Sequence, residues 1–86
     1  MDSPEAITIG LSSLTIFWED LGLPKRSRML RHEEDALAKF WDSDIQPWMD
    51  LAIQNPYNPH EAGVWFLNRQ DAILFKMRWG GNIPLQ

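Results

Sequence analysis

Five tryptophans and no cysteine stand in a chain of 86 residues. Without cysteine the fold has no disulfide and no thiolate metal site, so side-chain packing must hold it together. A chain of this length forms one small domain and buries roughly 64% of its unfolded surface. Since each indole buries about 200 Å², such a core has little room for all five. Either aromatic side chains build the small core, or one or two tryptophans lie at a partner surface.

Apolar periodicity and turn residues predict an α+β, mainly helical fold, with three to four short helices in a single compact domain over residues 1–86 and a loosely ordered tail at 82–86. The first helix is expected to begin at Ser12 or Ser13, because a hydroxyl there can cap it. Gly22, followed by Leu23 and Pro24, ends it. Its apolar stripe consists of Leu14, Phe17, Trp18 and Leu21. Before it, residues 5–9 are compatible with a strand or with a helix start.

A second helix is expected over residues 27–41, with apolar residues at helical spacing. Its N-terminus carries several cations, which the helix dipole disfavours. Either the helix begins near His32, with the acidic residues 33–35 in its first turn, or the cations are retained because they have a function.

A third helix is expected over residues 44–54, with Asp44 as its cap and Pro47 in its first turn. Two Asn-Pro steps in residues 55–63 then predict a rigid, irregular loop. Residues 63–67, which read GVWFL, predict a short strand buried on both faces.

Residues 69–79 fit two structures. Asn68 and Asp71 resemble a capping box, and Gly80-Gly81 resembles a helix end. However, the apolar residues of this segment also alternate with Lys76 and Arg78, as they would in a strand. We prefer the helix because both of its ends carry termination signals.

The chain lacks the residues of ordinary catalysis, and we expect no enzyme, no cofactor and no metal. It has no cysteine and no glycine-rich phosphate loop, and its histidines are His32 and His60. His32 lies in a charged run, and a neighbouring His-Glu pair such as His60-Glu61 is common by chance. No apolar stretch is long enough for a membrane span, so we expect no membrane partner and a cytoplasmic protein.

One basic island interrupts an acidic chain of net charge −4. It consists of Lys25, Arg26, Arg28 and Arg31. Such an island can bind phosphates, but dedicated nucleic-acid binders are usually basic overall. Pairing with the flanking acids and solvation is the simpler interpretation.

Exposed aromatic residues are the other candidate binding feature. Trp41 and Trp48 flank the expected junction at residues 42–47, and Tyr57 lies in the neighbouring loop. We therefore select Trp41, Trp48 and Tyr57 as candidate anchors for a protein partner. Surplus apolar surface is also compatible with a homodimer.

The C-terminal quarter resembles small, uncharacterised accessory proteins of tailed bacteriophages. The resemblance lies in the aromatic strand 65–67, in Asn68-x-x-Asp71-Ala72, and in Phe75-Lys76-x-x-Trp79-Gly80-Gly81. It implies a viral accessory role and carries over no catalytic residue. The expected function is a non-enzymatic protein-binding module that inhibits or redirects a host protein, such as a defence or transcription component. The alternatives are a nucleic-acid-binding accessory protein that uses residues 25–31, and a small phage structural or assembly protein.

Overall fold

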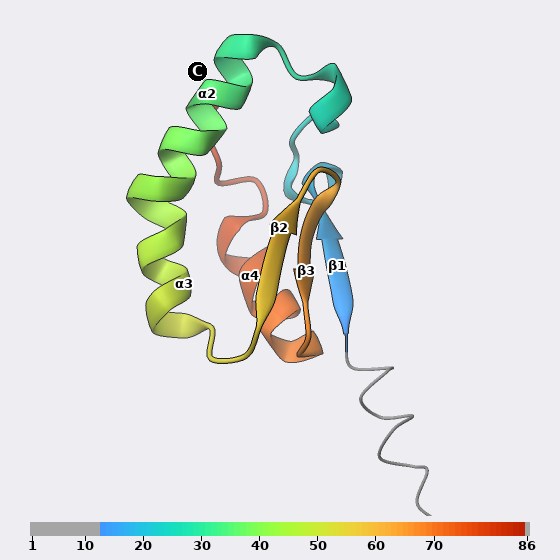
Figure 1. The fold of residues 1–86 in the computed structure, drawn as a ribbon, viewed down its shortest axis with the longest axis vertical. Coiled ribbons are helices and arrows are strands. Elements are labelled where there is room, and N and C mark those ends of the chain that lie inside the picture. The colour runs from blue at the N-terminus through green and yellow to red at the C-terminus, as the bar shows by residue number, and fades with distance from the viewer. Residues whose placement is uncertain (1–12, 86) are drawn as a thin grey trace, which may run out of the picture.

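The computed structural model describes residues 13–85, which form an α+β domain (Figure 1). The strands are β1 (Leu14–Phe17), β2 (Tyr57–His60) and β3 (Gly63–Phe66). The helices are α2 (Arg31–Phe40), α3 (Gln46–Ala52) and α4 (Arg69–Trp79). A π-helical turn, Trp41–Ile45, joins α2 to α3 without a break, and the three form one long helix. The α+β class is therefore confirmed. The expected three to four helices are wrong, since the described residues form two: the long helix and α4.

The three strands form an antiparallel sheet in the order β1-β3-β2. The predicted strand at 63–67 is confirmed as β3, which is central and pairs with both neighbours. In register, Ile16 lies opposite Val64, and Val64 lies opposite Pro59. The buried side chains of Ile16, Val64 and Phe66 alternate along the strands and face the core, while α4 lies behind the sheet (Figure 1).

The helix expected to begin at Ser12 or Ser13 is wrong. Residues Leu14–Phe17 form β1, and a 3-10 turn, Trp18–Leu21, follows. Thr15 and Ile16 are β-branched and favour the pleated strand, while pairing with β3 provides hydrogen bonds for the inner edge of β1. The stop signal at Gly22 is confirmed, because its φ is 85° and it caps the 3-10 turn. The segment 5–9 lies outside the described residues.

The long helix begins at Arg31, later than the expected residue 27. Arg26–Arg28 form a separate 3-10 turn before it. Glu33 and Glu34 occupy the first helical turn, and Glu33 Oε1 accepts a hydrogen bond from the Leu30 N–H at 2.9 Å. Of the two interpretations that the sequence left open, the late start with acids in the first turn is confirmed.

Asp44 does not cap a separate third helix, and that prediction is wrong. Asp44 lies inside the π-helical turn, and the Gln46 N–H donates to the Trp41 carbonyl five residues earlier. Pro47, which follows directly, has no N–H to donate and its ring crowds the preceding turn. A π turn widens the backbone at such a point, so the helix continues where a proline would otherwise end it.

The irregular loop expected over residues 55–63 is also wrong. Tyr57–His60 form β2, which pairs with β3 through a tight hairpin. β2 is an edge strand, and proline is tolerated in a strand at an edge, where its missing N–H costs no ladder bond. Pro59 is therefore compatible with the sheet.

The helix interpretation of residues 69–79 is confirmed. The Asn68 side chain accepts hydrogen bonds from the N–H groups of Gln70 at 2.8 Å and Asp71 at 3.4 Å. These contacts satisfy two of the free donors at the helix start. Gly80 caps the other end, and Gly81 follows with a φ of 76°.

The core lies between the sheet, α4 and the long helix. Phe75 of α4 is fully buried at its centre, and its ring lies 5.2 Å from that of Phe66. Ile83, beyond α4, is 9% exposed and belongs to the same cluster. The buried side chains of the long helix are Leu37, Ile45, Met49 and Ile53 at its end.

Candidate interaction surfaces

The three aromatic candidates from the sequence are half-buried and contact the core. Trp41 and Trp48 lie with their ring centroids 6.3 Å and 6.5 Å from that of Phe75. The Tyr57 ring lies 6.2 Å from that of Phe66. Each of these side chains thus has one packed face and a partly exposed remainder. Their role as partner anchors stays a prediction.

Gln46 connects two of these aromatic side chains by hydrogen bonds. Its Oε1 accepts from the Trp41 Nε1–H at 2.9 Å, and its Nε2 donates to the Tyr57 hydroxyl at 2.7 Å. Nε2 also donates to Asp50 Oδ1 at 3.0 Å. The structure therefore brings Trp41 and Tyr57 together across the long helix and β2, although they are far apart in sequence.

Two tryptophans lie in the core. Trp18 and Trp79 are each 2% exposed. The Trp18 indole N–H donates to the Glu61 carbonyl at 2.8 Å. The Trp79 ring contacts Phe40 and Trp48 edge-on, while its Nε1 has no hydrogen-bond partner in the described part of the chain. The small core therefore accommodates both indoles because its aromatic rings pack against one another.

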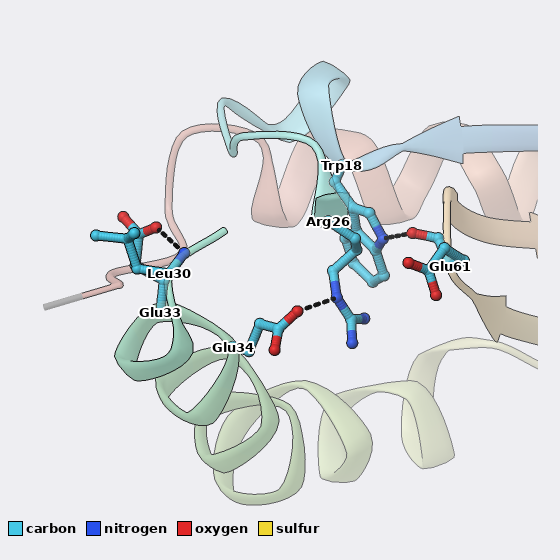
Figure 2. Close-up of polar contacts among 6 residues, drawn as sticks. All are labelled: Trp18, Arg26, Leu30, Glu33, Glu34 and Glu61. Atoms are coloured by element: carbon cyan, nitrogen blue, oxygen red, sulfur yellow. Dashed lines mark hydrogen bonds and ion pairs between the residues drawn. The ribbon is translucent and has the colours of Figure 1, made fainter. Parts of the chain in front are cut away.

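The four residues of the basic island differ in exposure. Lys25, Arg28 and Arg31 are exposed, whereas Arg26 is half-buried and turns toward the long helix. Figure 2 shows Arg26 beside the Trp18 ring, with its Nε 3.9 Å from Glu34 Oε2. This is a loose ion pair at a partly exposed position, so it contributes little stability.

Arg26 and Trp41 line the same cleft, which has a volume of about 290 Å³. It lies between the long helix and the end of β2 that carries Pro59 and His60. The indole N–H groups of Trp18 and Trp41 donate to Glu61 and Gln46, so both residues contribute ring surface to the cleft. The remaining lining residues are Glu34, Leu37, Ala38 and Asp42. This cleft combines an aromatic wall with charges of both signs.

A second surface lies on the outward side of α4. Ile73, Leu74 and Met77 are 45%, 43% and 76% exposed. Together with Leu14, Thr15 and Ile16 of β1, the side chains of Ile73 and Met77 line a groove of about 710 Å³. Phe17 at the end of β1 is 46% exposed. We call Ile73, Leu74 and Met77 the outer face of α4.

Sequence reasoning missed the outer face, although the sequence held a signal for it. Ile73 and Met77 are four residues apart, as are Phe75 and Trp79, and each pair lies on its own side of a helix. The apparent strand alternation of these four residues is therefore the pattern of a helix that is apolar on two sides. One such side packs in the core, and the other is left outside.

Both histidines lie at the surface. His32 is exposed, and His60 Nδ1 accepts a hydrogen bond from the Ala62 N–H at 3.3 Å. Within residues 13–85, no three His, Asp or Glu side chains are grouped so that they could hold a metal ion. No helix in that range is long and apolar enough to cross a membrane.

No protein-family model, curated protein or solved structure matches the chain. The resemblance of the C-terminal quarter to phage accessory proteins stays a prediction.

Proposed function

We propose that this chain is a non-enzymatic protein-binding domain that binds its partner through the outer face of α4. The observation that carries the proposal is the exposure of Ile73, Leu74 and Met77 on a helix whose other side is already packed in the core. Neighbouring apolar side chains on a surface are typical of interaction sites, whereas single exposed ones are ordinary.

The finer proposal is that of a phage-type accessory protein, which inhibits or redirects a host protein in the bacterial cytoplasm. Support for it comes from the sequence resemblance over residues 65–81, which includes α4 itself. A binding domain without catalytic groups acts by occupying a surface of its partner, so a stable stoichiometric complex is expected.

A pull-down from bacterial lysate tests the proposal with a pair of matched variants. The double variant Ile73→Asp/Met77→Asp places two charges on the outer face and should lose the partner. Leu51→Asp is the control, because Leu51 is an apolar side chain with 85% exposure that belongs to α3 and not to the outer face of α4. The proposal is supported if the wild type and the Leu51 variant retain the same protein and the double variant does not. Equal recovery with all three would refute it.

Nucleic-acid binding is the second candidate, and the exposure of Lys25, Arg28 and Arg31 favours it. In that case the recovered complex should be sensitive to nuclease and should dissociate as salt is raised. Replacing these three residues by glutamine should then abolish binding, and changes on the outer face of α4 should have no effect.

A further inference from the structure

The two edges of the sheet differ in how they are protected. β2 carries Pro59, exposes Asn58 and His60, and has the long helix beside it (Figure 1). Proline and covering helices are common means of preventing edge-to-edge pairing. β1 reads Leu-Thr-Ile-Phe, with neither proline nor charge, and no strand in residues 13–85 pairs with its outer edge. An edge strand of this kind presents unpaired N–H and C=O groups that can accept a further strand.

The groove next to β1 provides apolar contacts for such a strand. It runs between Leu14–Ile16 of β1 and Ile73 and Met77 of α4. A strand added to the edge of β1 would direct every second side chain toward α4, because side chains alternate between the two faces of a sheet. Small or branched apolar residues at those positions would cover Ile73 and Met77, both of which are exposed in the free chain.

The charges around this groove indicate which kind of partner segment can bind there. Arg69, Lys76 and Arg78 are the exposed charged residues of α4, and all are cations in a chain of net charge −4. Lys76 lines the groove, and Arg69 lies one turn before Ile73 on the same side of the helix. The acid of α4, Asp71, is half-buried and accepts a hydrogen bond from Asn55 at 3.1 Å. Asp20 is the acidic residue that lines the groove.

A second copy of the chain fits this edge less well than an acidic segment does. Antiparallel pairing of β1 with the β1 of a copy would place both α4 helices on one face of the extended sheet, side by side. Their cations would then face each other, and like charges in contact are unfavourable. A partner segment with carboxylates would instead be complementary to Arg69 and Lys76.

We propose that β1 binds an extended segment of the partner protein as a fourth strand, in which apolar residues alternate with Asp or Glu. The apolar side chains cover Ile73 and Met77, and the carboxylates lie near Arg69 and Lys76. This inference rests on the proposed protein-binding function and adds the chemistry of the partner and the mode of its binding.

The test uses the full chain and short synthetic peptides that alternate valine with glutamate. A second peptide carries lysine in place of glutamate, and a third keeps glutamate but is N-methylated on every second backbone amide along one edge. The glutamate peptide should bind at least roughly fivefold more tightly than the lysine peptide. N-methylation should abolish binding, because it removes the main-chain donors that pair with β1. Amide hydrogen exchange of Leu14–Phe17 should slow when the glutamate peptide is bound.

A charge-reversed variant distinguishes peptide binding at this site from non-specific electrostatic attraction between the peptide and the chain. Arg69→Glu/Lys76→Glu should reverse the preference and bind the lysine peptide more tightly. Lys39→Glu, a change at an exposed cation on α2, should leave the preference unchanged. The inference is overturned if the N-methylated peptide binds as well as its parent, if neither peptide binds, or if the chain forms dimers that protect β1. If the lysate partner is retained while the peptides fail, the proposed function stands and the fourth-strand inference is wrong.

Discussion

Phe75 and Met77 lie two positions apart on α4, yet Phe75 is fully buried and Met77 is 76% exposed. The two residues therefore give opposite predictions for stability. Phe75→Ala should lower the free energy of unfolding by about 3–5 kcal/mol, because it leaves a cavity at the centre of the aromatic core. Met77→Ala should change it by less than about 0.5 kcal/mol. Urea unfolding followed by tryptophan fluorescence measures both, and equal losses would contradict the orientation of α4.

Trp18 and Trp79 form a matched pair, since both are 2% exposed. The Trp18 N–H is bonded to the Glu61 carbonyl, whereas the Trp79 N–H has no partner within residues 13–85. Trp18→Phe removes a hydrogen bond to the Glu61 carbonyl, whereas Trp79→Phe removes a donor that was unsatisfied. Trp18→Phe should therefore cost about 1–2 kcal/mol more in thermal or urea unfolding. The reverse order would contradict these hydrogen-bond assignments.

Gln46 should act as a coupling residue between the long helix and β2. Gln46→Leu removes its bonds to Trp41 and Tyr57 and should destabilise the fold by about 1–2 kcal/mol. A double-mutant cycle with Trp41→Phe should give a coupling energy of about 1 kcal/mol. Gln70→Leu, at an exposed position on α4, is the control and should cost little. Strict additivity of the Gln46 and Trp41 changes would refute the link.

Gly63 should tolerate no side chain. A Cβ at this position of β3 would meet the Ile16 carbonyl oxygen and would lie 2.7 Å from the Phe17 Cα, both of which belong to β1. Gly63→Ala should therefore push β1 away from β3 and cost at least about 1–3 kcal/mol. Gly81→Ala has open space around it but keeps a φ of 76°, so its cost should be about 1–2 kcal/mol from backbone strain alone. Circular dichroism and urea unfolding compare the two, and a smaller loss for Gly63→Ala would be the contrary result.

The Asn68 cap gives a prediction for α4 that does not involve the core. Asn68→Ala should reduce stability by about 1 kcal/mol, because the N–H groups of Gln70 and Asp71 lose their acceptor. Asn68→Asp keeps an acceptor at the same place and should restore most of the loss. If both variants were equally destabilised, capping would not be the cause.

Local signals in the sequence predicted those parts of the fold that depend on local chemistry. The caps of α4 and the turn at Gly22 require particular residues at particular backbone angles, so they could be predicted. β1 could not, because Leu14, Phe17 and Trp18 are also spaced as a helical stripe and the decision comes from pairing with β3. Likewise, Pro47 is compatible with the first turn of a helix, and no local pattern predicts the π turn that lets the long helix continue through it.

The residues of the candidate site could also be predicted only in part. Trp41 was selected because it is aromatic and flanks the expected junction at residues 42–47, and Arg26 because it belongs to the basic island. The structure places both at one cleft. Arg26 is half-buried and faces Glu34 of the long helix, whereas Lys25, Arg28 and Arg31 are exposed, and no local pattern reports this difference. The outer face of α4 was not predicted, although residues 69–79 were expected to form a helix, because tertiary contacts decide which side of this helix packs in the core.

The position of β3 has a consequence for how the chain folds during synthesis. β1 stands near the beginning of the chain, and its partner β3 lies in the last third, after the whole long helix. Forming the sheet therefore requires closure of a long loop, which slows folding relative to a helical hairpin of the same size. While the ribosome makes the intervening residues, β1 has neither of its described neighbours, β3 or α4, to cover it. An acidic strand that binds its edge could also reach the chain at this stage, before the domain is complete.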